Sequence, residues 1–388
     1  MGSREKSLPD SRLFKRYDRL IRTPSVTGNE KAAAEYVAGE LEGMGLPVEW
    51  HWAEEGKWPS VKATLKGSDP SAESLLLIGH LDTVAVTEGW RTDPFTPVVD
   101  GDRVYALGSS DMKGGIAAIL EAVNRFIEKN DGRPKNRGSL HVAFSADEEG
   151  LSRGTYNLLR EGLSADMAIM AECRFSNIAI GFRGRYSMTA DVRGVAAHAS
   201  RYPEVGRNAI IDAAKLAAAI EELPTAQHPE AGRGTWCIRH IEGGIKTTLS
   251  VPDKCSVFID RYVVPGESPK SCMAQVTEAA KSLGIEERVT VALTKRDTPF
   301  MESFVIKRDH PLLLSVTRHF REVTGNDPSL EIDRSVCDSN YLVVLGGIPT
   351  VTFGPSGEGF HGPNEFGSIK EVEQAAEIYE RVIRDIIC

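Results

Sequence analysis

The sequence predicts an α/β protein, in which a mixed sheet covered by helices is interrupted by a smaller inserted α+β unit. Up to about residue 184, short apolar runs typical of buried strands alternate with helical patterns. From about Tyr186 the order becomes strand, helix, two strands, helix and strand, which is the ferredoxin-like signature. A length of 388 residues also exceeds one ordinary domain, so two structural units are expected.

The elements can be placed along the chain in order. In the first part, residues 74–79, 139–145 and 165–171 read as buried strands, and residues 111–129 have helical apolar spacing. The inserted unit is predicted to contain strands near 186–194, 235–241, 255–263 and 288–294, with helices at 206–223 and 269–283. A helix at 310–324, a strand at 350–353 and a helix at 369–387 follow. The predicted domains are therefore 1–184 and 297–388, which form the main domain, and 185–296, which is inserted into it.

Composition excludes several classes of protein. The hydrophobic fraction is 41%, the charged fraction is 26%, and no apolar run approaches the length of a membrane span. A formal net charge of -9 argues against nucleic acid as a partner. Residues 1–10 lack the apolar core of a secretory signal, so a cytoplasmic location is expected. The cysteines have no C-x-x-C spacing, which argues against a structural zinc knot or a disulfide framework.

The first predicted strand ends in Gly79-His80-Leu81-Asp82-Thr83. In extended chain His80 and Asp82 project to the same side, because side-chain direction repeats every two residues. The Asp82 carboxylate can then hold the imidazole, as acceptors behind metal-ligating histidines do. For this motif alone, a hydrogen-bonded pair at a strand end is the alternative.

Two acidic motifs follow. Asp111 stands at the start of a predicted helix, where a helix N-cap is the alternative interpretation. Asp147-Glu148-Glu149 follows the second strand, and adjacent carboxylates repel one another unless cations or solvent screen them. A solvated turn is the alternative for this second motif.

Two more candidates complete the set. Glu172 follows the third strand, and His361 begins the motif His361-Gly362-Pro363-Asn364-Glu365. Ligand sites in open α/β sheets lie at the carboxyl ends of strands, where four of the candidates fall, and independent capping would not give that pattern. Histidine and carboxylate ligands without thiolate suit zinc, cobalt or manganese, and two such ions flanking a bridging carboxylate make a hydrolytic centre.

These five motifs, in this order and spacing, resemble the family that contains aminoacylase, acetylornithine deacetylase, succinyl-diaminopimelate desuccinylase and glutamate carboxypeptidase. The resemblance implies a zinc-exopeptidase-like catalytic domain with a ferredoxin-like lid. It also implies a dinuclear metallohydrolase that cleaves the amide bond of a small, carboxylate-bearing N-acyl amino acid through a metal-bridging water. By the same resemblance, His80 and Glu172 hold one ion, Glu149 and His361 hold the other, Asp111 bridges both, Asp82 orients His80, and Glu148 is the general base. Glu at position 172 resembles the deacylase branch more than the carboxypeptidase branch.

The inserted unit adds further candidates through the same resemblance. His198 resembles the family's oxyanion-stabilising histidine, and Asn208, a candidate substrate-binding residue, opens the following helix. Arg261 and Arg296 resemble positions that clamp a substrate carboxylate, although ordinary surface ion pairs are the alternative. The family expectation is a homodimer through the lid, in which His198 reaches the active site of the opposite subunit.

One departure from the family pattern leaves the substrate open. Leu249 stands where the family's lid commonly carries Asn, with one extra residue in the loop that begins at Gly243-Gly244. The alternatives are a di- or tripeptidase, a carboxypeptidase, hydrolysis of another activated C–N bond, or a non-catalytic metal-binding homologue. The last would have lost the base or a ligand, yet Glu148 and all five ligand candidates are present.

Overall fold

The computed structural model describes residues 11–129 and 136–388, so the expectation for residues 1–10 lies outside the described residues. The chain divides into two compact units. The first extends to Gly181 and includes Ile306–Glu331 and Cys337–Cys388, and the second comprises Phe182–Val305 and Ile332–Val336. The predicted domain boundaries were residues 184 and 296, whereas the structure places them after residues 181 and 305. Nothing in the sequence predicted that residues 332–336 belong to the second unit. Among the described residues, no helix is long and apolar enough to cross a membrane.

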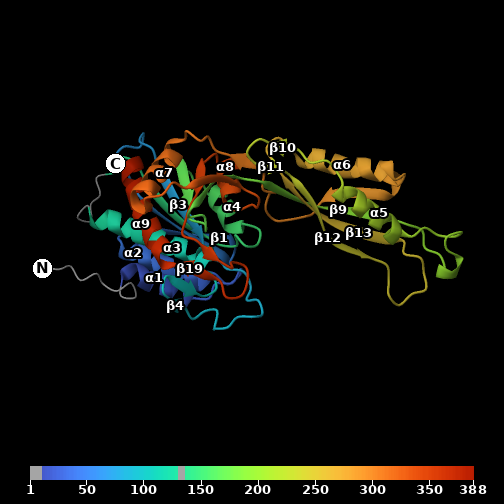
Figure 1. Ribbon diagram of the computed structural model, residues 1–388, viewed down its shortest axis with the longest axis horizontal. Coiled ribbons are helices and arrows are strands. Elements are labelled where there is room, and N and C mark those ends of the chain that lie inside the picture. Colours follow the sequence, from blue (N-terminus) through green and yellow to red (C-terminus); the bar gives the residue numbers. More distant parts are fainter. Residues whose placement is uncertain (1–10, 130–135) are drawn as a thin grey trace. The chain divides into compact units, whose positions relative to one another are not determined.

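The first unit contains helices and strands from both ends of the chain (Figure 1). Its helices are α1 (Arg12–Ile21), α2 (Lys31–Gly43), α3 (Gly114–Glu128), α4 (Arg153–Arg160), α7 (Pro311–Thr324), α8 (Ser339–Val344) and α9 (Ile369–Ile387), with a short turn η2 (Ser109–Lys113). Its strands are β1 (Val48–Glu54), β2 (Lys57–Leu65), β3 (Leu75–His80), β4 (Val98–Asp100), β5 (Arg103–Tyr105), β6 (Leu140–Ser145), β7 (Met167–Met170), β8 (Asn177–Phe182), β16 (Ser329–Asp333), β17 (Thr350–Thr352), β18 (Gly357–Glu358) and β19 (Phe366–Ser368).

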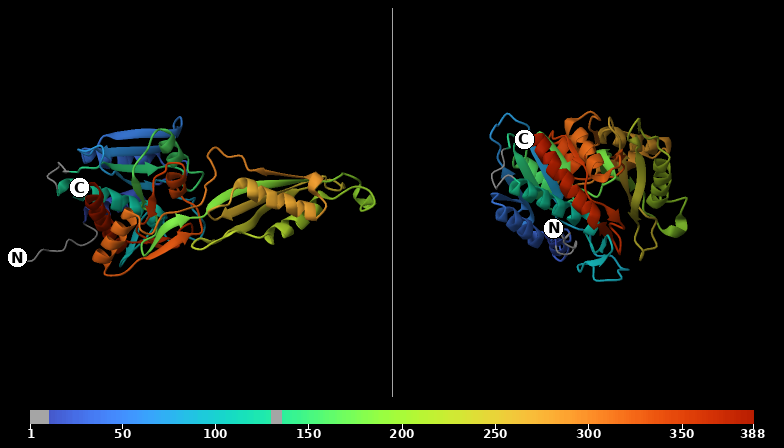
Figure 2. Two further views of the ribbon diagram at one scale, coloured as in Figure 1. Left: turned by 90° about the horizontal axis from the view of Figure 1, so that it is seen from above. Right: turned by 60° about the vertical axis from the view of Figure 1, so that its left-hand side comes forward.

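The main sheet is mixed, as predicted. Within the first unit its strands follow the order β1-β2-β6-β3-β7-β17-β8, with β16 also paired to β8. Strands β6, β3, β7 and β17 are parallel, whereas the edge hairpin β1–β2 is antiparallel. Every residue of β3 and β7 is buried, which explains why these strands read as continuous apolar runs. Helices α3 and α9 pack against each other and against β3, and α9 (red) lies along α3 in Figures 1 and 2.

The register brings the strand ends together. His80 is the last residue of β3 and pairs with Ser145, the last residue of β6. Ile78 of β3 pairs with Met170, the last residue of β7. Because these three strands are parallel, the residues that follow them lie at the same edge of the sheet. The polar motifs that follow β6 and β7 are thereby placed beside His80.

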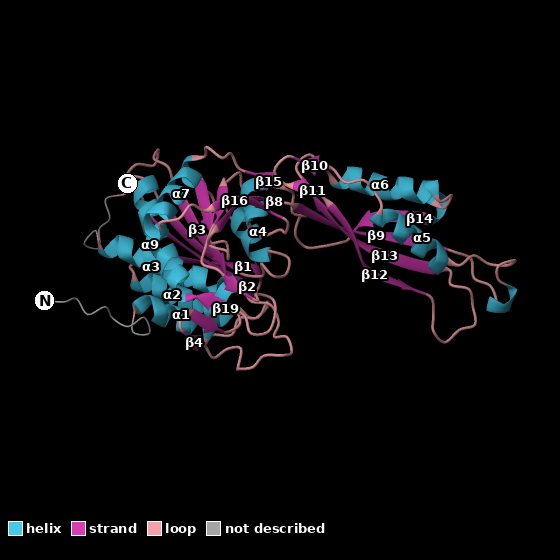
Figure 3. Cartoon of the chain, viewed as in Figure 1, coloured by secondary structure: helices cyan, strands magenta, loops and turns pink. Residues whose placement is uncertain are grey.

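The second unit has the predicted ferredoxin-like order. Its elements are β9 (Gly184–Arg193), η3 (Ala199–Arg201), α5 (Ala209–Glu221), β10 (Gln227–His228), β11 (Gly232–Arg233), β12 (Thr235–Gly243), β13 (Lys254–Val263), α6 (Pro269–Ser282), η4 (Glu286–Arg288), β14 (Val289–Leu293) and β15 (Phe304–Val305). The antiparallel sheet has the order β12-β13-β9-β14. Helices α5 and α6 contact each other and lie along the sheet (Figure 3). Buried apolar side chains from these helices and from the strands form one cluster.

Candidate metal centre

His80 lies fully buried at the carboxyl end of β3. Its Nδ1 is 3.0 Å from the backbone carbonyl oxygen of Asp82 and 3.5 Å from the carboxylate Oδ1 of the same residue. Because oxygen acceptors face Nδ1, we assign the proton to this nitrogen, which leaves the lone pair of Nε2 available. Nε2 lies 3.2 Å from Asp111 Oδ1 and 3.2 Å from Glu172 Oε1. The imidazole is therefore oriented to share a cation with these two carboxylates.

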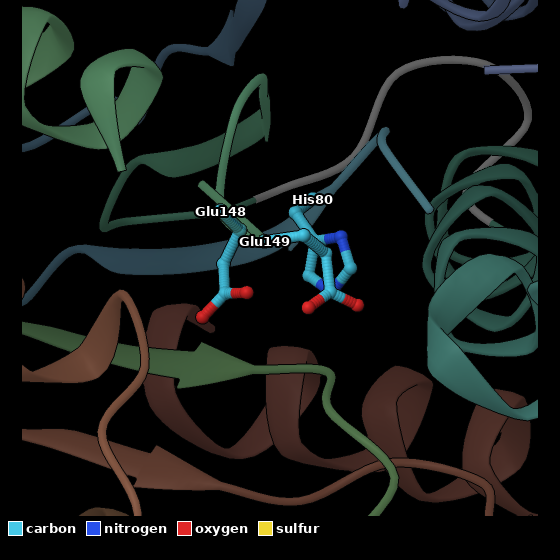
Figure 4. Close-up of side chains that lie close together, drawn as sticks. All are labelled: His80, Glu148 and Glu149. Carbon is cyan, nitrogen blue, oxygen red and sulfur yellow. The ribbon is translucent and has the colours of Figure 1, made fainter. Parts of the chain in front are cut away.

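The Asp82 carboxylate mainly holds the turn that follows β6. Asp82 is fully buried, and its oxygens accept hydrogen bonds from the backbone N–H groups of Glu148 at 3.0 Å and Glu149 at 3.1 Å. The expected contact between Asp82 and His80 is present, but the shorter distance runs to the Asp82 backbone oxygen. Asp82 thus fixes His80 and the acidic turn in one arrangement. Figure 4 shows His80, Glu148 and Glu149 pointing to the same side of the sheet edge.

Asp147 and Glu149, two acids of this turn, both have buried side chains but different partners. Asp147 is 1% exposed, and its carboxylate accepts from the backbone N–H groups of Leu151 and Arg153 and pairs with the Arg153 guanidinium at 2.9 Å. It therefore stabilises the loop, and its φ of 64° gives the turn its direction. The side chain of Glu149 is only 7% exposed, so the alternative of a solvated turn is wrong.

Asp111 lies in the turn η2, ahead of α3. Its φ of -119° and ψ of 95° are not helical, and α3 begins only at Gly114, so the alternative of a helix N-cap is wrong. Its two carboxylate oxygens face different histidines. Oδ1 lies 3.2 Å from Nε2 of His80, and Oδ2 lies 3.2 Å from Nε2 of His361. This is the geometry expected of a carboxylate that bridges two cations.

His361 comes from the loop between β18 and β19, and its side chain is 50% exposed. Its Nε2 lies 2.9 Å from Glu149 Oε1 as well as 3.2 Å from Asp111 Oδ2. A φ of 61° at this non-glycine residue is uncommon, and such backbone conformations persist where the surrounding structure holds them. His361, Glu149 and Asp111 thus form a second group of ligand atoms, which shares Asp111 with the group around His80.

The charges of this cluster strongly affect one another. The carboxylates of Asp111 and Glu149 raise the pKa of His361 to about 10. Burial opposes a charge on His80, but the carboxylates of Glu172 and Asp111 outweigh it and raise the pKa of this imidazole well above its usual value. Burial raises the pKa of Glu148 and of Glu149, with the charge of Glu149 adding to the rise at Glu148 and the charge of Asp111 adding to the rise at Glu149. Several acids crowded at a buried strand edge repel one another, which is the electrostatic environment that favours bound cations.

The donor atoms fit two divalent ions. Three groups each have ligand atoms within 4.8 Å of one another: His80 with Asp111 and Glu172, Asp111 with Glu149 and His361, and His80 with Glu148 and Glu149. Asp111 belongs to the first two groups, which correspond to the two predicted metal positions. Imidazole nitrogen and carboxylate oxygen are ligands that zinc, manganese and cobalt accept. All five predicted ligands are therefore brought together in the first unit.

Glu365 was not anticipated from the sequence. Its side chain is almost fully buried, and its carboxylate accepts hydrogen bonds from the backbone N–H groups of Gly108 at 3.0 Å, Ser110 at 2.8 Å and Asp111 at 3.0 Å. Burial raises the pKa of Glu365 to about 7 despite these donors. The only sequence signal was its position four residues after His361, since a glutamate in a polar loop ordinarily faces solvent. Glu365 ties the loop of His361 to the turn of Asp111.

Asp338 is a second buried acid that the sequence did not single out. Its carboxylate accepts hydrogen bonds from the hydroxyls of Thr155 and of Ser145, the last residue of β6. Burial raises the pKa of Asp338 to about 6, and its charge in turn contributes to the raised pKa of Glu148. Asp338 therefore supports the strand end from which the acidic turn departs.

The remaining predicted site residues lie in the second unit. His198 is exposed beside η3, and its Nδ1 accepts a hydrogen bond from the backbone N–H of Ser200 at 3.2 Å. Asn208 caps helix α5, with its side-chain oxygen accepting from the N–H groups of Ile210 and Ile211. Leu249 is 75% exposed, and its carbonyl accepts from the N–H of Ala199 at 2.8 Å, so it lies next to the His198 segment. Their catalytic and substrate-binding roles stay predictions.

Both candidate carboxylate clamps have partners inside the second unit. Arg261 has no exposed side-chain surface, because its guanidinium pairs with Glu267, donates to the Tyr262 carbonyl oxygen at 2.6 Å and lies over the ring of Trp236. Arg296 donates to Thr298 Oγ1 at 2.7 Å and lies over the Phe300 ring. This arrangement places the Arg261 guanidinium in the interior of the second unit, and the substrate-binding roles of both arginines stay predictions.

Comparison with known proteins agrees with the fold and the centre. The profile of peptidase family M20/M25/M40 matches residues 76–385. A succinyl-diaminopimelate desuccinylase from Nitrosomonas europaea is 29% identical, with 95% of this chain and 97% of the relative covered. Aminopeptidase PepT from Bacillus cereus has a similar structure, with a TM-score of 0.79, 23% identity, and 97% and 98% of the two chains covered. A tripeptidase from Staphylococcus aureus has a TM-score of 0.78 at 23% identity over the same shares. The chain is therefore a metal-dependent hydrolase of peptidase family M20/M25/M40.

Proposed function

We propose that this enzyme hydrolyses the amide bond of a small N-acyl amino acid, with two zinc ions at the centre described above. The observation that carries the proposal is Asp111, whose two oxygens face His80 and His361 separately while Glu148 stands beside them. The similarity in sequence to desuccinylases, which act on an acylated amine by their name, favours a deacylase. Cobalt or manganese would suit the same ligands.

The chemistry of the bound ions and that of the protein residues are complementary. When bound, a pair of divalent ions lowers the pKa of a shared water and polarises the scissile carbonyl. Glu148 is suited to take the proton of the attacking water and return it to the leaving nitrogen. Its side chain makes no hydrogen bond or ion pair with any residue in 11–129 or 136–388, and burial together with Glu149 raises its pKa, although His80 opposes the shift. A carboxylate held ready in this way is a competent general base.

A di- or tripeptidase, or a carboxypeptidase, is the second candidate, because solved relatives include a tripeptidase and an aminopeptidase. The discriminating feature is a free α-amine on the substrate. We expect kcat/KM for the best N-acetyl or N-succinyl amino acid to exceed that for the matching dipeptide and tripeptide by about ten-fold or more. The test is a panel of these three substrate classes, assayed with zinc, cobalt and manganese. A reversed preference would replace the deacylase by the peptidase.

We also propose a homodimer through the second unit, in which His198 serves the opposite active site. Because Nδ1 of His198 accepts from the Ser200 N–H, the proton belongs on Nε2, which is a donor suited to a developing oxyanion. Exposed apolar side chains on the same unit support an interface: Val195 at 57%, Ile245 at 70% and Leu249 at 75%. A cytoplasmic location likewise stays a prediction.

Mixed dimers test the role of His198. His198→Ala and Glu148→Ala should each be nearly inactive alone. After subunit exchange, one site in each mixed dimer regains both groups, so activity should return to about a quarter of wild type for random pairing and independent sites. Demonstrated exchange without recovery would show that His198 does not act across the interface.

A further inference from the structure

Three arginines line a cavity of about 350 Å³ within the second unit. Arg183 precedes β9, Arg233 ends β11, and Arg334 lies in the short segment 332–336. The other lining residues are Glu230, Ala231, Gly232, Thr235 and Ile332. We call this feature the arginine cavity. All of its lining residues belong to the second unit, and none of them is among the predicted metal ligands.

Arg183 is the buried member of the three arginines. It is only 7% exposed, its backbone N–H donates to the carbonyl oxygen of Asp333 at 3.1 Å, and its Nη2 lies 3.4 Å from the carbonyl oxygen of Ala231. Burial lowers the pKa of Arg183, and the charges of Arg334, Arg261 and Arg233 lower it further, against the opposing effect of Asp333. A buried guanidinium thus lies close to the positive charges of Arg233 and Arg334, which adds to the positive potential of the cavity.

The other two arginines of the cavity differ from Arg183 in their surroundings. Arg233 and Arg334 are exposed, and neither side chain makes a hydrogen bond or ion pair with a residue in the described ranges 11–129 and 136–388. Other arginines of this unit do have acid partners; for example, Arg185 pairs with Asp260, and Arg288 pairs with Asp212. Against three arginines, Glu230 is the one acid among the described lining residues. The cavity therefore carries an excess of positive charge.

We propose that the arginine cavity is a binding site for a small anion that carries a carboxylate or a group of similar oxyanion chemistry. Planar guanidinium forks bind such groups through paired N–H donors, which a lysine ammonium cannot do in the same way. The volume lies within the range of small-molecule pockets, which is roughly 300 to 1,000 Å³. The anion has two possible sources: the carboxylate of the substrate itself, which rests on the proposed function, or a free small anion that binds independently of turnover.

Sulfate is the probe that tests the site, because it has oxyanion chemistry and is a weak metal ligand. The measurement is isothermal titration calorimetry on the metal-loaded protein at constant ionic strength. We expect wild type to bind sulfate, and Arg233→Gln/Arg334→Gln to bind it about ten-fold or more weakly. Arg193→Gln is the matched control, because Arg193 is an exposed arginine at the far end of β9, nine residues or about 30 Å along the strand from Gly184.

A kinetic comparison identifies the source of the anion. The ratio of kcat/KM for an N-acyl amino acid to that for the matching N-acyl amine, which lacks the carboxylate, is measured in wild type and in the double variant. A ratio reduced about ten-fold in the double variant assigns the cavity to the substrate carboxylate, whereas an unchanged ratio with variant-sensitive sulfate binding assigns it to a free anion.

The proposal is overturned if sulfate binds wild type and the double variant with equal affinity, or if Arg193→Gln weakens binding as much as the double variant does. Because both substitutions are at exposed side chains, melting temperatures should stay close to that of wild type, and circular dichroism checks that the variants are folded. If no N-acyl amino acid is hydrolysed at all, the proposed function fails, but sulfate binding still decides whether the cavity is an anion site.

Discussion

Glu365 offers a direct test of how the centre is held in place. In Glu365→Gln one oxygen can still accept from Ser110 and Asp111, but the new amide group faces the N–H of Gly108, which then loses its acceptor. An unsatisfied buried donor costs about 1–3 kcal/mol. The metal-free turn can relax to recover this cost, whereas the metal-bound turn must keep Asp111 in place. The cost of the unsatisfied N–H therefore weakens metal binding more than it destabilises the metal-free protein. We expect Glu365→Gln to bind both ions about 10- to 100-fold more weakly than wild type.

The assay is a metal titration against a competing chelator, followed by measurement of bound metal after dialysis. Glu358→Gln is the matched control, because Glu358 is an exposed glutamate on the neighbouring strand β18 and should bind both metals as wild type does. Glu365→Asp keeps the charge but shortens the reach, so an intermediate affinity is expected. If Glu365→Gln binds both ions with wild-type affinity and only its metal-free melting temperature falls, Glu365 stabilises the fold and has no part in positioning Asp111.

Three further predictions concern the ligands and the base. Glu148→Ala should abolish measurable turnover and retain two bound metals, because a base moves protons without holding an ion; kinetics and metal analysis check this. Asp111→Ala should weaken both metal positions together, since each histidine faces one of its oxygens, and titration measures this. Apparent metal affinity should rise with pH between about 6 and 8, by about ten-fold per unit for each proton displaced, because His361, with its pKa near 10, must lose its proton to bind.

Different outcomes would contradict each of these predictions. Loss of metal in Glu148→Ala would show that the division of roles between Glu148 and Glu149 is wrong. One tight, unaltered position in Asp111→Ala would exclude a bridge. For the pH series, the sign follows from competition: protons occupy the imidazole at low pH and leave it as pH rises toward 10, so an affinity that falls with pH would contradict the proton competition.

The sequence predicted the elements whose own residues carry a clear apolar pattern. Strand β3 is buried at all six positions, so its apolar run could be recognised without knowing its neighbours. Helix α9 has the predicted bounds, Ile369–Ile387, because its apolar spacing persists to its last residue. The hairpin β1–β2 was missed, since β1 has mixed exposure and contains neither a buried run nor a strict alternation.

The sequence could not show that Asp111 lies in a separate turn before helix α3. Helical spacing extended the predicted helix to residue 111, whereas the structure starts α3 at Gly114 after non-helical conformations at Asp111 and Met112. Local propensity does not reveal this change, because the hydrogen bonds that hold the turn come from Glu365, more than 250 residues away in the chain. Predictions from local patterns fail where a distant side chain satisfies the backbone.

The convergence of the ligands also depends on two glycines that carry no chemistry. A Cβ at Gly115 would lie 2.1 Å from the carbonyl oxygen of Ala171, the residue before Glu172, and a Cβ at Gly79 would lie 2.6 Å from the Met112 side chain. Helix α3 can therefore approach the end of β7 only because a side chain is absent at its second residue. This close approach lets Asp111 and Glu172 come within 3.2 Å of the same imidazole nitrogen of His80. Side-chain identity supplies the ligands, but the absence of side chains at these contacts sets the distances at which they can share an ion.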